Sequence, residues 1–447
     1  MGEHIAQAVP TVPPFSMPTW IRPVVGVGDG GTVLAGGWIR AQQFDVVTRD
    51  EDGHHLITRM SEDAIIDHAD DRNKAVTVLE NLYKPRADFA GLELAKPHLM
   101  GVINTTPDSF SDGGAHLAPA TAIASGMAMW QAGASVIDIG GESTRPGAAP
   151  ITRNQELARV LPPITGLARQ NIRLSIDTRH AEVMTRACAA GAAIINDVEA
   201  LRRDGALDAA AESGAPVIIM HMQGQPENMQ DEPHYEFAPV DIYQFLEERI
   251  DAAVAAGIGK SHIAVDPGFG FGKTVAHNLQ ILNWLSLFHG LGVPILFGAS
   301  RKSTIAKLSK DEPADQRLAG SLALAMAAYR QGAQLLRVHD VGETAQAGEL
   351  VNILIADVAR QAVAADALDA GQVLADQLQN CAQPLRRKIQ RVAVGEEDAR
   401  DGHARVRHEA QVALDLVERP HAVLLLRRGV HLAEGALVPA AADRRLE

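Results

Sequence analysis

The sequence predicts an α/β protein whose central part is a (β/α)8 TIM barrel, and two observations lead to this class. Short, β-branched apolar runs recur between residues 97 and 357, and an Ala- and Leu-rich stretch typical of a helix follows most of them. Each run is continuously apolar rather than alternating, as expected for parallel strands buried on both faces. Eight such units in about 260 residues match the size of a closed barrel. An open, doubly wound sheet is the alternative, because periodicity does not show closure.

The expected elements follow one another in regular order. Strands are predicted at 98–104, 135–140, 173–177, 193–198, 217–222, 263–266, 295–299 and 335–339. Helices are predicted between them at 120–132, 156–170, 181–190, 240–256, 275–288 and 316–331.

The two outer regions have a different character, so we expect three parts: 1–96, 97–357 and 358–447. Residues 1–96 begin with spaced prolines and contain weak strand signals at 32–34 and 44–48 and a helix signal at 74–82. They are interpreted as an N-terminal extension or small accessory subdomain. Residues 358–447 are Ala- and Arg-rich, with helix signals at 366–378 and 408–416, and are interpreted as a C-terminal extension, helical or partly disordered.

Composition excludes several classes of protein. The formal net charge is −14 and no basic cluster is interleaved with aromatics, which argues against nucleic-acid binding. Cys188 and Cys381 are the only cysteines, too few for a disulfide framework and typical of a reducing compartment. No run approaches the roughly 20 apolar residues that a membrane span needs, and the N-terminus lacks the order of a secretory signal. We therefore expect a cytoplasmic protein.

Polar side chains stand at the carboxyl end of nearly every predicted strand. In a barrel these ends meet at one face, where the connecting loops carry the active site. A barrel without a site there would not be expected to place a polar group at so many strand ends. The groups are Asn104, the run 140–147, Asp177, Asn196, Asp197, His221, Asp266, Lys302 and His339.

The eighth strand carries two cationic residues on one face. Arg337 and His339 are two positions apart, so they point to the same side of the strand and suit a phosphate or diphosphate. The alternative is that Arg337 is buried in an ion pair with Asp177 or Asp266. The run 298–303 (GASRKS) also suits anion contact at a loop–helix junction, although a solvated Arg-Lys pair is the commoner interpretation of such a dipeptide.

A stiff, Gly-studded loop, 266–273 (DPGFGFGK), follows the sixth strand. A carboxylate at Asp266 could accept two parallel N–H bonds from a planar, amidine-like edge. The alternative is a turn-forming Asp before Pro. Phe271 and Phe110 lie on Gly-rich loops, where ligand contact is more natural than core burial.

Several of these segments resemble the signatures of dihydropteroate synthases. The stretch 100–114 (MGVINTTPDSFSDGG) resembles the first signature of that family, and 140–147 (GGESTRPG) resembles its second mobile loop. Shorter segments match in order and spacing, at 175–178, 195–197, 220–224, 266–273, 300–303 and 337–340. The resemblance covers 97–357 and leaves both outer regions unmatched.

The resemblance implies a transferase of folate biosynthesis, in a family that is commonly dimeric and is a sulfonamide target. It would condense 6-hydroxymethyl-7,8-dihydropterin diphosphate with 4-aminobenzoate, with Mg²⁺ as cofactor, giving 7,8-dihydropteroate and diphosphate. The implied pterin pocket is Asp177, Asn196, Asp266 and Lys302. The implied diphosphate site is Asn104, Arg337 and His339, with Asn104 also a Mg²⁺ ligand. Ser143, Thr144 and Arg145 belong to the closing loop, and Phe110, Phe271 and Ser303 surround the aminobenzoate.

The expected mechanism is an SN1-like substitution in which Asp177, Lys302, Arg337 and His339 act. Mg²⁺, Arg337 and His339 would neutralise the leaving diphosphate, and Asp177 would stabilise the cationic methylene left on the pterin. One alternative is a pterin-dependent methyltransferase of the same superfamily, which would not need the Lys302 loop together with the diphosphate pair. Another is a non-catalytic pterin-binding protein, marked by decay of two loops that are complete here.

Overall fold

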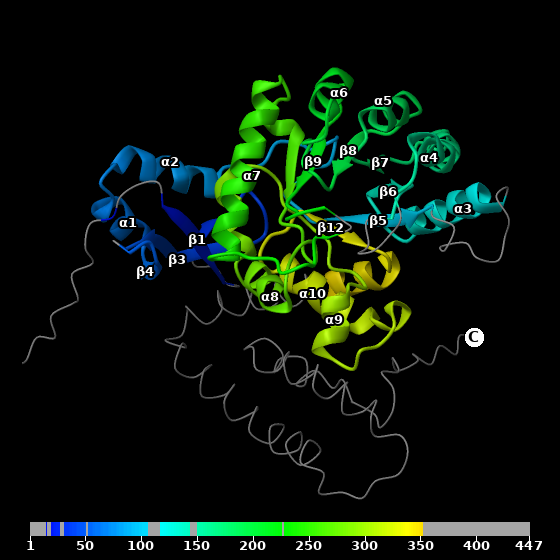
Figure 1. Ribbon diagram of the computed structural model, residues 1–447. Coiled ribbons are helices and arrows are strands. Elements are labelled where there is room, and N and C mark those ends of the chain that lie inside the picture. The colour runs from blue at the N-terminus through cyan, green and yellow to red at the C-terminus, as the bar shows by residue number, and fades with distance from the viewer. Residues whose placement is uncertain are drawn as a thin grey trace, which may run out of the picture. The chain divides into compact units, whose positions relative to one another are not determined.

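The computed structural model describes residues 15, 19–26, 31–50, 52–105, 117–143, 150–225 and 228–351. Eight parallel strands form one sheet in the order β10-β9-β8-β7-β6-β5-β12-β11. An isolated bridge between Val265 of β10 and Ile295, the residue before β11, joins the two ends of this sheet. The ring is thereby nearly closed, which confirms the predicted barrel against the open sheet (Figure 1).

Every barrel strand lies within the range predicted for it. Their interior faces carry large aliphatic residues, which build an apolar layer through the barrel. The strands are β5 (His98–Asn104), β6 (Val136–Gly140), β7 (Leu174–Asp177), β8 (Ile194–Asp197), β9 (Val217–Met220), β10 (Ile263–Asp266), β11 (Leu296–Phe297) and β12 (Leu335–Val338).

Helices alternate with these strands along the chain. The α-helices are α3 (Leu117–Gln131), α4 (Arg153–Ala168), α5 (Ala181–Ala189), α6 (Ala206–Ser213), α7 (Ala238–Ala255), α8 (Val275–Asn283), α9 (Ser303–Leu308) and α10 (Leu318–Tyr329). Single-turn or short 3-10 helices are η2 (Lys260–His262), η3 (Leu285–Leu291) and η4 (Ala314–Gln316). No helix in the described part of the chain is long and apolar enough to cross a membrane.

The predicted helix 275–288 is wrong at its end. The α-helix stops at Asn283, the chain turns at Trp284, and η3 continues with all of its residues buried. The Trp284 ring packs against Phe237 and under the guanidinium of Arg22, which holds the turn. The start was predicted correctly because Thr274 caps α8 in a capping box. The signals at 366–378 and 408–416 lie outside the described residues.

An antiparallel sheet precedes the barrel. Its strands are β1 (Trp20–Gly26), β2 (Thr32–Val33), β3 (Arg40–Arg49) and β4 (His55–Met60), and its helices are α1 (Glu62–His68) and α2 (Arg72–Tyr83). The central strand β3 pairs with each of the other three, and β2, β3 and α2 fall on the predicted signals. Strand β1 was not predicted because it contains Pro23, which has no N–H, but its edge position tolerates this residue.

The sheet-bearing segment 19–86, called here the N-terminal subdomain, packs on the barrel through η3 and the end of α10. Ser286 donates its hydroxyl to the carbonyl of Pro23 at 2.8 Å. Arg86 donates to the carbonyl of His289 at 2.7 Å, and the Trp38 indole donates to the carbonyl of Tyr329 at 3.0 Å. These side chain–backbone bonds join the subdomain to the barrel, whose strands belong to a separate sheet.

Gly332 offers a test of this contact. Its φ is +84°, and a Cβ would lie 2.4 Å from Cδ1 of Ile39 and 2.8 Å from Nε2 of His289. Gly332→Ala should therefore lower the free energy of unfolding by about 1–3 kcal/mol through strain and overlap. Thermal unfolding measures it.

Gly53→Ala is the matched control. Its φ is +87° and no atom lies within 4 Å of the added Cβ, so only the conformational cost of about 1 kcal/mol remains. Equal losses in the two variants would contradict a tight contact at Gly332.

Candidate active site

Strand register brings four predicted positions to one level at the carboxyl end of the barrel. Asn104 is paired with Gly140, Gly140 with Asp177, and Asp177 with Asn196, across strands β5 to β8. A Cβ on Gly140 would lie 3.7 Å from Oδ1 of Asn104 and 3.6 Å from Oδ2 of Asp177. The two oxygens therefore border the same space, which Gly140 leaves open.

Arg337 of β12 lies between two carboxylates. Its Nε donates to Oδ2 of Asp138 at 2.7 Å, and its Nη2 donates to Oδ2 of Asp177 at 2.7 Å. The amide of Asn196 donates to the same Asp138 oxygen at 3.2 Å. The ion pair between Arg337 and Asp177 that the sequence left open is thus present, and Asp138 is a second partner.

Asp138 was missed by the sequence analysis. It is fully buried in the middle of β6, between Ile137 and Ile139, and its Oδ1 has no hydrogen-bond partner among the described residues. A lone carboxylate inside an apolar strand is the signal that could have found it, because such a group is almost never buried without a partner.

The carboxylates and the guanidinium shift one another's ionisation. Burial raises the pKa of Asp177, and the neighbouring Asp138 adds to this effect against the opposing charge of Arg337. Burial alone would lower the pKa of Arg337, but Asp138 and Asp177 outweigh it and raise that pKa. Arg337 therefore keeps its charge, and Asp177 ionises less readily than an exposed aspartate.

Lys302 lies against the β10 loop, which begins at Asp266. The Lys302 stem passes Gly270, whose φ is +83° and whose added Cβ would lie 3.0 Å from Cδ of the lysine. Its ammonium donates to the carbonyl of Phe269 and lies 4.2 Å from the centre of the Phe271 ring. Burial lowers the pKa of Lys302 to about 7, against the charge of Asp266.

Asp266 is held as an acceptor by its own loop. It is buried, and its Oδ1 accepts the backbone N–H of Gly268 at 2.7 Å, in the turn foreseen as the alternative. Burial raises its pKa, while Lys302 acts in the opposite direction. The turn hydrogen bond uses Oδ1, so the turn and a ligand-facing Oδ2 are compatible.

Lys273 closes the same loop, a role that the sequence did not indicate. It is buried, and its amine contacts Nδ1 of His221 at 2.9 Å, the His221 carbonyl at 3.3 Å and the Phe271 carbonyl at 2.8 Å. Burial lowers the pKa of both Lys273 and His221 well below their usual values. The pair therefore acts as a hydrogen-bonding lock between β9 and the loop after β10.

The remaining predicted residues lie around this centre. His339 contacts the hydroxyl of Ser300 through Nδ1 at 3.0 Å. Arg301 is partly exposed and pairs with Asp340, its Nε donating to Oδ2 at 3.0 Å. Ser143 is half-buried, and Ser303 is exposed at the start of α9. Phe110, Thr144 and Arg145 lie outside the described residues.

A buried ion-pair network holds the backbone that leads into Ser143. Arg179, 5% exposed, binds Glu142 through Nε at 2.9 Å and Glu199 through Nη1 at 2.7 Å. Arg203 reaches the second oxygen of Glu199 at 2.9 Å. The network joins the ends of β6, β7 and β8 and was not predicted.

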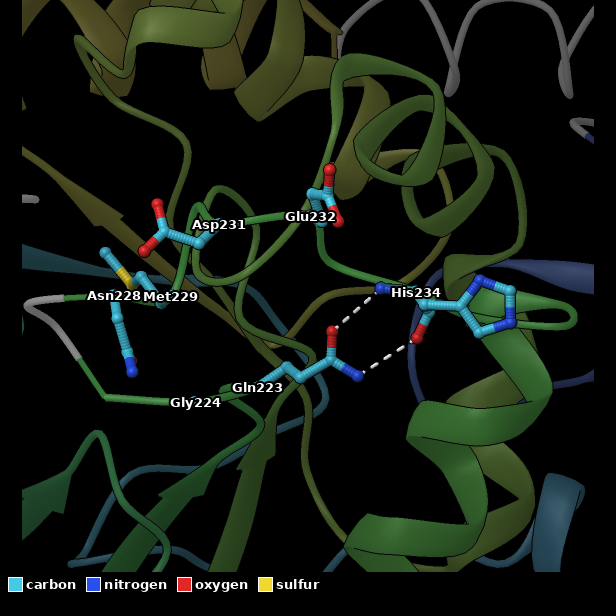
Figure 2. Close-up of a pocket in the computed structure, with 7 residues that line it drawn as sticks. All are labelled: Gln223, Gly224, Asn228, Met229, Asp231, Glu232 and His234. Carbon is cyan, nitrogen blue, oxygen red and sulfur yellow. Dashed lines mark hydrogen bonds between the residues drawn. The ribbon is translucent and has the colours of Figure 1, made fainter.

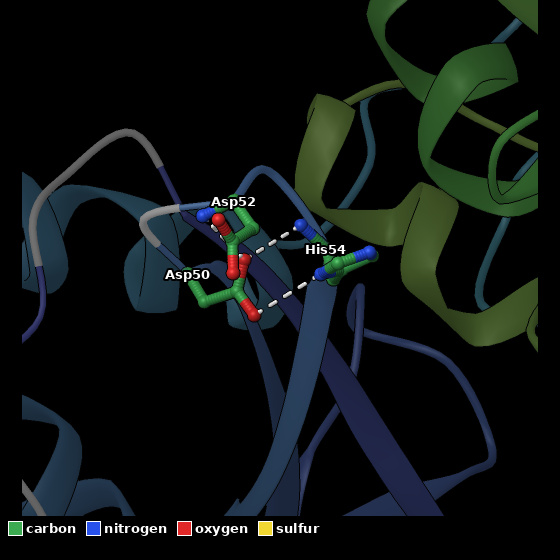
Figure 3. Close-up of side chains that lie close together, drawn as sticks. All are labelled: Asp50, Asp52 and His54. Carbon is green, nitrogen blue, oxygen red and sulfur yellow. Dashed lines mark hydrogen bonds and ion pairs between the residues drawn. The ribbon is translucent and has the colours of Figure 1, made fainter.

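Two other polar groupings lie apart from this centre. A pocket of about 300 Å³ is bordered by the loop after β9, where the Gln223 amide bonds both backbone groups of His234 (Figure 2). In the turn between β3 and β4, Asp50 accepts the N–H of Asp52 and of His54 (Figure 3). These three side chains could approach one cation, but their hydrogen bonds are those of a hairpin turn.

Comparison with known proteins identifies the family of the region that contains the site. A family model described as "Pterin binding enzyme" matches residues 100–339. The dihydropteroate synthase of Escherichia coli (strain K12) is 46% identical over 266 residues, which cover 59% of this chain and 94% of that protein.

Solved structures give the same result. The Yersinia pestis dihydropteroate synthase with a sulfonamide drug complex is 50% identical, with a TM-score of 0.57, covering 59% of this chain and 95% of that one. The Xanthomonas albilineans dihydropteroate synthase with 4-aminobenzoic acid is 49% identical, with a TM-score of 0.57, covering 60% and 98%.

The Arg179 network generates a stability prediction. Arg179→Met leaves Glu142 and Glu199 buried without their shared cation and should lower the free energy of unfolding by about 3–5 kcal/mol. Arg203→Met is the control, because Arg203 is 34% exposed and its loss should cost less than about 1 kcal/mol. Chemical denaturation measures both, and equal losses would contradict the central place of Arg179.

The lowered pKa of Lys302 generates a second prediction. With a pKa of about 7, about half of its amine is unprotonated at neutral pH, whereas ordinary lysines reach this point near pH 10.4. The rate of acylation of Lys302, relative to exposed Lys307 of α9, should therefore fall as the pH rises from about 7 to about 10. Peptide mass spectrometry gives both rates, and a constant ratio would contradict the shift.

Proposed function

The chain belongs to the dihydropteroate synthase family of pterin binding enzymes, and on that premise we propose how its residues carry the reaction. It is a transferase with dihydropteroate synthase activity. The proposed reaction joins 6-hydroxymethyl-7,8-dihydropterin diphosphate to 4-aminobenzoate and releases diphosphate. The observation that carries the assignment of residues is the gathering of Asp177, Asn196, Asp266, Lys302 and Arg337 at one end of the barrel.

The pterin pocket is assigned to the acceptors and donors of strands β7, β8 and β10. Asp266 would accept N–H groups of the pterin's amidine-like edge through Oδ2, since Oδ1 is used by Gly268. Asn196, fixed by Asp138, and Lys302 would meet the remaining donor and acceptor atoms. Oδ1 of Asp138, two residues before Gly140 on β6, has no partner among the described residues and is a further acceptor, which supports a ligand rich in N–H groups.

The diphosphate site is assigned to Asn104, Arg337 and His339. Arg337 supplies a permanent charge, and His339 is oriented by Ser300 at 3.0 Å. The amide oxygen of Asn104 and the carboxylate of Asp177 border one open space, and oxygen ligands of this kind suit Mg²⁺. Mg²⁺, when bound there, would supply charge neutralisation to the departing diphosphate.

The aminobenzoate surroundings are assigned to Phe271, Ser303 and Phe110. The Phe271 ring lies half-buried beside the Lys302 ammonium, and Ser303 is exposed at the start of α9. Ser143, Thr144 and Arg145 would close over the bound substrates and exclude water, which competes for the same carbon.

In the proposed mechanism, cleavage of the bond from carbon to diphosphate runs ahead of attack by the amine. Arg337 and His339 neutralise charge as it develops on the leaving group. Asp177 stabilises the cationic methylene group on the pterin. The aromatic amine then forms the new C–N bond and loses its proton, so no covalent bond to the enzyme is needed.

We also propose an assembly and a place for the outer regions. Leu322, Leu324 and Met326 of α10 are half-exposed, which supports a homodimer through the last barrel helices. Residues 1–96 would be an accessory subdomain, 97–357 the catalytic barrel and 358–447 a C-terminal extension. The paucity of cysteines supports a cytoplasmic location.

Turnover tests the function directly. Purified protein with dihydropterin diphosphate, Mg²⁺ and 4-aminobenzoate should form dihydropteroate and diphosphate in equal amounts. Lys302→Ala should lower kcat/KM about a hundredfold or more, because it removes the hydrogen-bonding amine assigned to the pterin pocket. Lys307→Ala, on the exposed side of α9, is the control. Absence of product with the unaltered protein would contradict the proposed function.

Substituted aminobenzoates test the mechanism. If cleavage precedes attack, kcat should vary little with the basicity of the amine across a series of ring-substituted analogues. A steep dependence on basicity would instead show direct displacement. Rates at saturating concentrations of each analogue separate this effect from binding.

A further inference from the structure

The N-terminal subdomain touches the barrel at a second place, on the loop that follows β9. The ring of His55, at the start of β4, lies 5.6 Å from the ring of Phe237. Phe237 in turn packs edge-on against Trp284 at 5.0 Å, and Arg49 pairs with Glu236 at 3.4 Å. Phe237 and Glu236 are the last residues of that loop before α7, so this contact holds its C-terminal end.

Tyr235, which precedes Glu236, contacts the loops that support the active site. The hydroxyl of Tyr235 donates to the carbonyl of Gly272 at 2.8 Å. Its ring lies 5.8 Å from the ring of His221 and 5.9 Å from the amine of Lys273. Tyr235 thus contacts the group that locks the loop after β10, between Asp266 and Lys273.

Elsewhere the β9 loop is held by Met229, which is buried against Met220 and Met222, and by the Gln230 amide, which donates to the carbonyl of Gly270 at 2.9 Å. The other side chains of the loop are mostly exposed. Gln225, Asn228, Gln230, Asp231, Glu232 and His234 are exposed. Gly268 and Gly272 bring the β10 loop so close that a Cβ would lie 1.9 Å from the His221 carbonyl and 2.6 Å from the Gln223 carbonyl. A shift of the β9 loop must therefore move the β10 loop, because the two backbones are in contact.

We propose that the N-terminal subdomain positions the pterin pocket through the contacts His55–Phe237, Tyr235–Gly272 and Lys273–His221. Residues 19–86 lie before the family match, which begins at residue 100, so this would be a device of this chain's own extension. His55, Phe237 and Tyr235 are positioning residues, since they contact the β9 and β10 loops rather than the reacting atoms. The inference rests on the proposed function for its kinetic consequence only.

The first test compares two neighbouring histidines. His55→Ala removes the ring that contacts Phe237, whereas His54→Ala removes an exposed ring that pairs only with Asp50 among the described residues. His55→Ala should raise KM for dihydropterin diphosphate about threefold to tenfold and change kcat less than about twofold. His54→Ala should leave both constants unchanged. Identical constants in the two variants would overturn the proposal.

A double-mutant cycle separates positioning from general stability. Tyr235→Phe removes the hydrogen bond to Gly272, and its effect on KM should not add to that of His55→Ala, because both act through one loop. Trp38→Phe removes the hydrogen bond to the Tyr329 carbonyl, a contact with the barrel that does not involve the β9 loop. Its effect on KM, whatever its size, should therefore add to that of His55→Ala. Additive effects of His55→Ala and Tyr235→Phe would contradict a shared route.

Amide hydrogen exchange without substrate distinguishes this inference from the proposed function. His55→Ala and Tyr235→Phe should speed exchange in the segments 221–225 and 266–273, and His54→Ala should not. Unchanged exchange in all three variants would overturn the inference even if the protein is an active synthase. Faster exchange in an inactive protein would support the positioning contacts while the proposed function fails.

Discussion

The guanidinium of Arg337 lies between the carboxylates of Asp138 and Asp177, and the arrangement of the barrel mouth depends on this contact. Parallel strands bring their polar ends to one face, which concentrates acidic groups from β6, β7 and β10. Buried carboxylates without a cation would repel one another and lose hydration. Arg337 offsets this cost and connects β12 to β6 and β7 across the barrel. Because Arg337 binds each carboxylate through one nitrogen, its remaining N–H groups can donate to an anionic ligand while both ion pairs are kept.

The loops around this centre are held by buried polar contacts rather than by apolar packing. Arg179 fastens the stem before Ser143, and Lys273 fastens the loop that carries Asp266. Both are long side chains with nitrogen donors in buried positions, and each replaces water with several oxygen or nitrogen contacts. Such contacts are directional, so they fix the backbone conformation and not only its distance from the core. A site that recognises a flat ligand by its pattern of donors and acceptors requires such a fixed backbone.

The sequence predicted the strands well because each barrel strand is a short apolar run bounded by turn residues. The strand-end residues followed from the same pattern, since the carboxyl ends of parallel strands must converge. Asp138 was missed although a lone carboxylate in an apolar strand marks it. The partner of Arg301 could not be predicted in this way, because it depends on how the loops after the neighbouring strands β11 and β12 face one another. Strand β1 escaped prediction because Pro23 breaks its pattern, and η3 because the packing of Trp284, distant in sequence from Phe237 and Arg22, ends the preceding helix.

Diphosphate affinity tests the central claim most directly. The Kd of diphosphate, with Mg²⁺ and a dihydropterin present, would be measured by calorimetry for the unaltered protein, Arg337→Met and Asp138→Asn. If Arg337 is the anion-binding cation that Asp138 restrains, Arg337→Met should weaken binding about tenfold or more, and Asp138→Asn should strengthen it. If both variants bind diphosphate as the unaltered protein does, or both bind it more weakly to the same degree, Arg337 serves only the internal ion pair and the account is contradicted.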